Sequence, residues 1–159
     1  MPTVVTSQPI DPTTLDRVFT RADIEFEGLD HSSSSYEGRV FLNKLDADGR
    51  TPLNDPAYAG SYFVFGHGGC LGDIGHCDVK PRRPFDPRPA HPLTPTRKVV
   101  IATGPIRRAL SEGAELTVTV VPIILSTSPR LGHPDDIVKF ERVRIITYLW
   151  GERSTQGGA

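Results

Sequence analysis

Residues 58–77 read YAGSYFVFGHGGCLGDIGHC and join two halves of opposite character. The first half is rich in aromatic and β-branched residues, which favours a strand over residues 61–65. The second half is rich in glycine and holds both cysteines and two of the five histidines of the chain. The stretch therefore predicts a strand that ends in a loop, and the loop carries the residues best suited to chemistry.

Short runs separated by breakers continue in both directions from this stretch. Fifteen glycines and fifteen prolines cluster between β-branched runs, as expected for many strands connected by ordered loops. The clearest run is LTVTVV (116–121), in which Leu116, Val118 and Val120 share one face because side chains alternate along a strand. The sequence predicts an all-β domain with strands over residues 17–27, 37–43, 61–65, 98–103, 115–125 and 137–150.

Other segments are predicted to depart from regular strands. Residues 137–150 alternate less cleanly, so a bulge at Glu141 and Arg142 is expected to absorb the change of phase. One short helix is predicted over residues 106–112, with Gly113 as its stop, and Asp48 and Gly49 are expected to form a turn. The six prolines of residues 80–96 predict a long irregular loop over the surface.

The domain organisation follows from these segments. Residues 1–14 are interpreted as an N-terminal extension, residues 15–150 as the β domain and residues 151–159 as a disordered tail. At 159 residues, one domain can bury enough surface to fold without metal or disulfides.

Charge and hydropathy disfavour several classes of partner. Eighteen basic and 19 acidic residues leave a net charge of −1, which argues against nucleic acid and anionic membranes. Residues 1–14 lack the basic and apolar parts of a signal peptide, and no apolar run is long enough to span a membrane. We expect a cytoplasmic protein, with export as a passenger of a partner as the alternative.

The loop of residues 67–77 carries ligand types that zinc and copper prefer, namely His67, Cys70, His76 and Cys77. Their spacing, H-x2-C-x5-H-C, matches no standard zinc knuckle. A disulfide between Cys70 and Cys77 is one alternative to a metal site, and two unlinked thiols beside surface histidines are another. A thiol enzyme is disfavoured, because no signature of such an enzyme surrounds these cysteines.

Five blocks of the chain, taken in order, carry a resemblance to a known family. They are EGRVFLN (37–43), YAGSYFVFGH (58–67), VVIATGPIRRAL (99–110), LTVTVVP (116–122) and VKFERVRIITY (138–148). In this order they resemble the C-terminal domain that follows the dicopper domain of plant polyphenol oxidases and bacterial tyrosinases, which is similar in outline to the β-sandwich of molluscan haemocyanin. The first block departs from the plant motif, because Gly38-Arg39-Val40-Phe41 stands where that motif has its lysine and aspartate. The resemblance spans about residues 17–148 and implies an antiparallel β-sandwich of six to eight strands with one short helix.

The resemblance also implies that the catalytic domain is missing from this chain. Type 3 copper oxidases hold copper with histidines on a helical bundle, whereas the five histidines here, at positions 31, 67, 76, 91 and 133, fall on predicted strands or loops. We therefore expect a non-catalytic chain that packs on a dicopper oxidase, shields its copper site or helps it mature. The expected partner is a type 3 copper oxidase chain or another oxidoreductase subunit.

The resemblance suggests the loop of residues 67–77 as the partner contact, with Leu71 or Ile74 as the plug. The alternative is that both side chains anchor the loop to its own sheet. Further candidates for partner contact lie in the proline-rich segment, at Arg82, Arg83, Phe85 and Arg88. Two other functions stay open, a copper or zinc carrier that uses the same loop and a structural subunit of a larger oxidoreductase assembly.

Overall fold

The computed structural model describes residues 3–31, 33–66, 85, 95–113, 115–124 and 137–150. In these ranges the chain forms seven strands, one α-helix and one 3-10 turn. The strands are β1 (Val5–Thr6), β2 (Arg21–Leu29), β3 (Tyr36–Leu42), β4 (Tyr58–Val64), β5 (Thr96–Ile101), β6 (Val118–Ile124) and β7 (Arg142–Tyr148). The helix α1 spans Thr103–Ser111, and the 3-10 turn η1 spans Pro12–Thr14.

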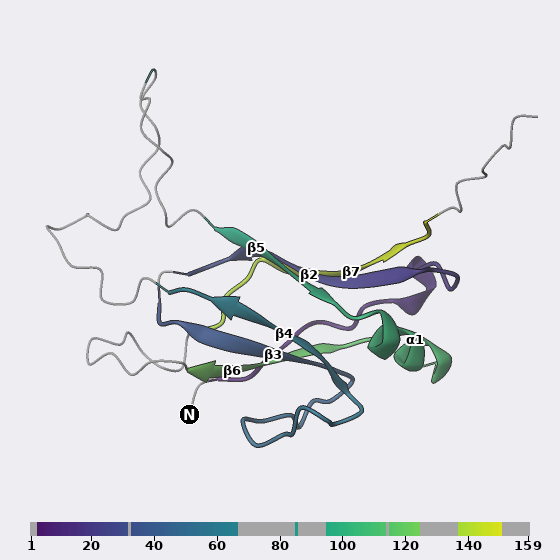
Figure 1. The fold of residues 1–159 in the computed structure, drawn as a ribbon, viewed down its shortest axis with the longest axis horizontal. Coiled ribbons are helices and arrows are strands. Elements are labelled where there is room, and N and C mark those ends of the chain that lie inside the picture. Colours follow the sequence, from purple (N-terminus) through teal and green to yellow (C-terminus); the bar gives the residue numbers. More distant parts are fainter. Residues whose placement is uncertain are drawn as a thin grey trace, which may run out of the picture.

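The strands form two sheets that face each other. One sheet has the order β1-β6-β3-β4 and the other has the order β5-β2-β7, and every strand pair is antiparallel. Figure 1 shows the two sheets as stacked layers, with β5, β2 and β7 in the upper layer. The all-β sandwich that the sequence predicts is confirmed.

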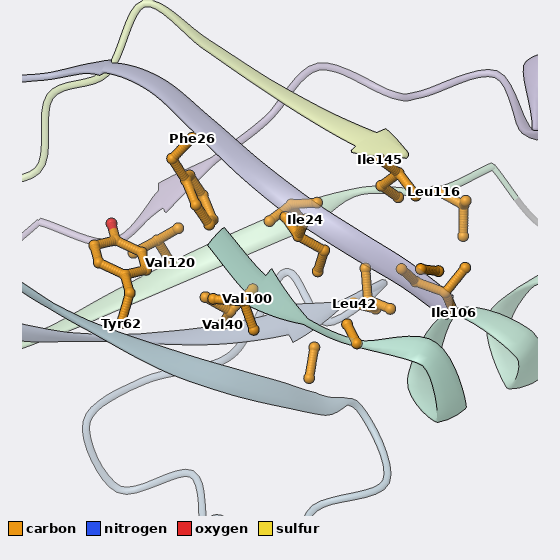
Figure 2. Close-up of a cluster of buried hydrophobic side chains, with 14 of the residues drawn as sticks. Ile24, Phe26, Val40, Leu42, Tyr62, Val100, Ile106, Leu116, Val120 and Ile145 are labelled. Atoms are coloured by element: carbon orange, nitrogen blue, oxygen red, sulfur yellow. The ribbon is translucent and has the colours of Figure 1, made fainter. Parts of the chain in front are cut away.

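Inward side chains of both sheets fill the space between the layers. The strand β2 contributes Ala22, Ile24 and Phe26, which are all fully buried. Figure 2 shows Ile24 and Phe26 pointing toward residues of the facing sheet, such as Val120 and Tyr62. The predicted shared face of Leu116, Val118 and Val120 is also confirmed, because all three side chains are buried in this core.

A second, smaller core covers the outer face of the β1-β6-β3-β4 sheet. It is built around Phe41 of β3, Val121 of β6 and Ala47, with Ala57 and Tyr58 packed against it. The connection between β3 and β4 supplies Ala47 and Ala57, and it hangs below the lower layer in Figure 1. Within this connection Asp48 forms the predicted turn, and its Oδ1 accepts bonds from the backbone N–H groups of Arg50 at 2.8 Å and Thr51 at 2.9 Å.

The helix α1 closes one end of the sandwich by burying Ile106, Ala109 and Leu110. It begins at Thr103, three residues before the predicted start, because proline is tolerated in the first turn of a helix. Its end agrees with the prediction, since Gly113 follows the last turn with a φ of 73°. Neither helical segment in the described ranges is long enough and apolar enough to cross a membrane.

The prediction of a bulge at Glu141 and Arg142 is wrong, because the irregularity lies on β2 and not on β7. The strand β7 begins at Arg142 and pairs with β2 in unbroken register up to Glu27. The register shift is on β2, between Phe26 and Leu29, where Gly28 has a φ of 65°. A glycine takes up this left-handed conformation at low cost, so the irregularity falls opposite Glu141 and not within β7.

Candidate interaction surface

Most of the side chains that the sequence predicts for a site lie outside the described residues. These are His67, Cys70, Leu71, Ile74, His76, Cys77, Arg82, Arg83 and Arg88. Phe85 is described, and its side chain is fully exposed. The described ranges contain no group of three or more His, Cys, Asp or Glu residues that could hold a metal ion.

The chain that leads into the 67–77 loop is fixed at Gly66. The backbone N–H of Gly66 donates to the hydroxyl of Ser35 at 3.1 Å. A Cβ added at Gly66 would lie 2.1 Å from the carbonyl oxygen of Ser33, so only glycine fits this close approach. The serine-rich connection between β2 and β3 therefore holds the end of β4 in place.

A charged surface that the sequence analysis did not predict covers the outer face of the β5-β2-β7 sheet. Because Ala22, Ile24 and Phe26 point into the core, the alternate residues of β2 point outward. The register places outward residues of β5 and β7 beside them. We call this surface the outer β2 face, and it comprises Arg21, Asp23, Glu25, Glu27, Arg97, Val99, Ile101, Arg142, Arg144, Ile146, Tyr148 and Trp150.

Glu25 lies at the centre of the outer β2 face and is completely buried there. Its Oε1 accepts a hydrogen bond from Nη2 of Arg97 on β5. Its Oε2 accepts from Arg144 on β7, with Nε at 3.0 Å and Nη2 at 2.9 Å. Two guanidinium groups from the two neighbouring strands therefore cover this carboxylate.

The other two carboxylates of β2 are paired in the same way. Asp23 accepts two bonds from Arg21, from Nε and Nη2, both at 2.8 Å. Glu27 binds Nη2 of Arg144 at 2.7 Å through Oε1 and Nε of Arg142 at 2.8 Å through Oε2. Arg144 thus bridges Glu25 and Glu27, which form one network with Arg97 and Arg142, while Asp23 and Arg21 form a separate pair on the same face.

The network is layered, with carboxylates below and guanidinium groups above. The side chains of Asp23, Glu25 and Glu27 are between 0% and 24% exposed, whereas those of the four arginines are between 39% and 62% exposed. The hydrogen bond from Arg142 lowers the pKa of Glu27, and the hydrogen bond to Asp23 raises the pKa of Arg21. The charges that solvent or a partner meets on this face are therefore mainly positive.

A shallow hollow of about 190 Å³ lies at one end of the outer β2 face. It is lined by Arg21, Asp23, Tyr148 and Trp150. The guanidinium carbon of Arg21 lies 5.9 Å from the centroid of the Tyr148 ring, within the range of a cation–π contact. The hollow therefore combines aromatic walls with an ion pair that is already satisfied.

A larger cavity of about 460 Å³ lies between α1 and the connection from β3 to β4. Its charged groups make contacts within the connection and one contact between the connection and α1. Lys44 Nζ lies 3.4 Å from Asp46 and 3.5 Å from Asp55, and Nη2 of Arg108 donates to the carbonyl oxygen of Pro56 at 3.0 Å. These contacts give structural roles to Lys44, Asp46, Asp55 and Arg108, so we assign no ligand to this cavity.

The sequence does contain the signal for the outer β2 face. Residues 21–27 read RADIEFE, in which charged and apolar residues alternate strictly. That alternation indicates one charged and one apolar face. It does not indicate which arginines cover the carboxylates, because Arg97, Arg142 and Arg144 are far away in sequence.

Comparison with known proteins shows a likeness of fold. No protein-family model and no curated protein matches the chain. Among solved structures, one that matches is a recombinantly expressed latent aurone synthase, a polyphenol oxidase, co-crystallised with hexatungstotellurate(VI) and soaked in H2O2. The TM-score is 0.53 at 15% sequence identity, and the match covers 94% of this chain but 24% of the aurone synthase chain. The chain thus has the fold of about a quarter of a polyphenol oxidase.

Proposed function

We propose that this chain is a non-catalytic domain of the kind found at the C-terminus of polyphenol oxidases and tyrosinases, and that it packs on a type 3 copper oxidase. In that role it shields the copper site of the partner or assists its maturation. The observation that carries the proposal is the fold likeness to part of a polyphenol oxidase over 94% of this chain.

The placement of the resembling sequence blocks supports this proposal. EGRVFLN covers most of β3, YAGSYFVFGH contains β4, and LTVTVVP contains most of β6. VVIATGPIRRAL runs from β5 into α1, and VKFERVRIITY ends with β7. The blocks thus lie on β3, β4, β5, α1, β6 and β7 in that order and leave out β1 and β2, so the likeness rests on five of the seven strands and the helix.

Mixing the purified chain with a type 3 copper oxidase chain from the same genome tests the proposal. We expect the two chains to elute together in size-exclusion chromatography, and excess of this chain to slow phenol oxidation by the oxidase. An unrelated β-sandwich protein of similar charge serves as the control for both measurements. Persistent failure to associate with any such oxidase, or phenol oxidation by this chain alone, would contradict the proposal.

A further inference from the structure

We propose that the outer β2 face is the docking surface of this chain and that it binds a protein surface carrying carboxylates beside apolar side chains. The inference rests on the proposed function in taking a type 3 copper oxidase as the partner. It goes beyond that function in naming the face and the chemistry that the face recognises.

The two outer faces of the sandwich differ in how they are covered. The β1-β6-β3-β4 sheet carries the second core on its outer face, where Ala47 and Ala57 cover Phe41 and Val121. In the described residues no corresponding apolar layer covers the β5-β2-β7 sheet, and Val99 and Ile101 of β5 stay 41% and 62% exposed. An amphipathic sheet face that the described part of its own chain leaves open is suited to a partner.

Exposed apolar side chains flank the guanidinium groups on both edges of the face. Val99 and Ile101 lie on the β5 side, and Trp150 is exposed beyond the end of β7. Single exposed apolar residues are ordinary, but here they accompany four arginines and Tyr148 on one face. Arginine, tyrosine and tryptophan are the residues most enriched where protein interfaces bind most strongly.

The charge of the layered network selects a partner with carboxylates. In the ion pairs with Asp23, Glu25 and Glu27, the four arginines use only their Nε and Nη2 atoms. A guanidinium group has five N–H donors, so the Nη1 group of each arginine takes no part in these ion pairs. The carboxylates below already hold the arginines in place, which reduces the entropy that binding would cost.

The same network disfavours polyanions and membranes as partners. Three carboxylates lie directly beneath four guanidinium groups, so the face has only one net positive charge, and the whole chain has a net charge of −1. Binding of a phosphate backbone depends on a large excess of positive charge. A protein surface with a few carboxylates needs no such excess.

The hollow at the end of the face supplies a position for an anchoring side chain. Its volume of about 190 Å³ is below the roughly 300–1,000 Å³ of small-molecule sites. Because Tyr148 and Trp150 line it, it suits one side chain of a protein partner better than a free ligand.

Affinity measurements with Ile101→Asp test the proposal, and Leu53→Asp is the matched control. The side chains of Ile101 and Leu53 are both exposed, and Leu53 lies in the connection between β3 and β4, away from the outer β2 face. The probe is the type 3 copper oxidase chain of the same genome. We expect Ile101→Asp to weaken binding about tenfold or more and Leu53→Asp to leave it unchanged. Circular dichroism of both variants checks that they are folded.

A second variant tests the guanidinium groups separately from the apolar contact. Arg142 has the most exposed side chain of the four arginines. Because salt screens exposed charges, binding of the wild-type chain should weaken as salt is added. Arg142→Gln should bind more weakly at low salt and show a smaller salt dependence.

The possible outcomes separate this inference from the proposed function. If the oxidase binds the wild-type chain and Ile101→Asp with equal affinity, the inference is wrong and the proposed function stands. Loss of binding in Leu71→Asp in that case would assign the contact to the loop of residues 67–77. If the oxidase binds no form of the chain, the proposed function is wrong. The inference is then tested by photo-crosslinking in cells, with the crosslinking residue at position 101 or, as the control, at position 53.

Crosslinking supports the inference only if position 101 captures a protein that position 53 does not capture. The captured protein, once identified and purified, must also bind the wild-type chain and not Ile101→Asp. Capture of nucleic acid or lipid, or no capture from position 101, overturns the inference.

Discussion

Gly38 makes room in the core for the ring of Tyr62. The two residues face each other across β3 and β4, and a Cβ added at Gly38 would lie 2.5 Å from Cζ of the Tyr62 ring. The same ring lies 4.8 Å from the ring of Phe26, measured between centroids. The glycine that departs from the plant motif therefore has a structural role, because it lets one aromatic ring reach across the sandwich.

The substitution Gly38→Ala is expected to destabilise the protein. The methyl group would force the Tyr62 ring out of its position, and overpacking of a core typically costs about 1–3 kcal/mol. Urea unfolding followed by circular dichroism would measure the change. Gly49→Ala is the control, because a Cβ at Gly49 meets only Ile123 Cδ1 at 3.7 Å; equal effects of the two substitutions would contradict this explanation.

The hydroxyl groups of Tyr36 and Tyr62 are buried in the core, and within the described residues neither makes a hydrogen bond of good geometry. Burial raises the pKa of Tyr36 to about 12, and burial also raises the pKa of Tyr62. The folded state therefore keeps these phenols protonated at a pH where the unfolded chain has begun to lose the protons.

The alkaline stability of the protein should depend on Tyr36. Its folded pKa lies above the ordinary value of 10, so stability is complete below pH 10 and falls as pH rises toward 12. A pKa difference of this size corresponds to roughly 3 kcal/mol in the free energy of unfolding. Tyr36→Phe should reduce the loss of stability between pH 10 and 12. At neutral pH the variant should be as stable as the wild type or slightly more stable, because it lacks a buried hydroxyl without a well-formed hydrogen bond. Urea unfolding at several pH values would show it, and an unchanged alkaline slope in the variant would refute it.

The strand β2 is buried on both faces by different means. Its inner face carries Ala22, Ile24 and Phe26 in the apolar core, and its outer face carries carboxylates under arginines. The arginines come from β5 and β7, on either side of β2. The ion pairs therefore connect all three strands of the sheet on the face away from the core.

Removing the charge of Glu25 should weaken this sheet. Loss of one partner from a buried ion pair can cost about 3–5 kcal/mol. Here the side chains of Arg97 and Arg144 are about half exposed and can be hydrated when the carboxylate is lost. We therefore expect Glu25→Gln to lower the free energy of unfolding by about 2 kcal/mol. Glu27→Gln, at a more exposed carboxylate, should cost less. Thermal or urea unfolding of the two variants measures both values, and a smaller cost for Glu25→Gln would show that its burial adds nothing.

The elements differ in how well the sequence predicts them. The strand β6 follows from the alternation after Leu116, and the stop of α1 follows from Gly113. The strand β4 begins three residues before the prediction, at Tyr58, because its pairing with β3 resumes beyond Gly60 after a register shift between Val40 and Phe41. The strand β1 was not predicted, since its two residues have no pattern of their own and are fixed by pairing with Val120 and Thr119.

The candidate surface was harder to predict than the fold for a physical reason. Glu25 and Arg144 form one ion pair although 119 positions separate them. No local pattern specifies such a pair, and only the order β5-β2-β7 brings the partners together. The predicted cysteine and histidine loop lies outside the described residues, so its role as a metal site or disulfide stays a prediction.

At the scale of the whole molecule, the sandwich is asymmetric. One sheet is covered on its outer side by the connection between β3 and β4, and the other presents a charged and apolar face. This asymmetry fits a domain that covers a partner with one side.

The metal-carrier alternative makes a separate prediction for the whole chain. Protein prepared under reducing conditions should bind copper or zinc through His67, Cys70, His76 and Cys77, and Cys77→Ser should lose most of the metal. Elemental analysis of dialysed protein measures the occupancy. Full occupancy in Cys77→Ser would remove this thiol from the site, and a Cys70–Cys77 disulfide that persists in reductant would exclude both thiols as ligands.

The position of Trp150 has a practical consequence. It is the single tryptophan of the chain, its side chain is 68% exposed, and it lines the hollow beside Arg21 and Tyr148. The tryptophan fluorescence of the protein therefore arises from one indole at the edge of the outer β2 face. A partner without tryptophan that settles there would shift the emission to shorter wavelength and protect the indole from soluble quenchers, so the chain reports on that surface without any added dye.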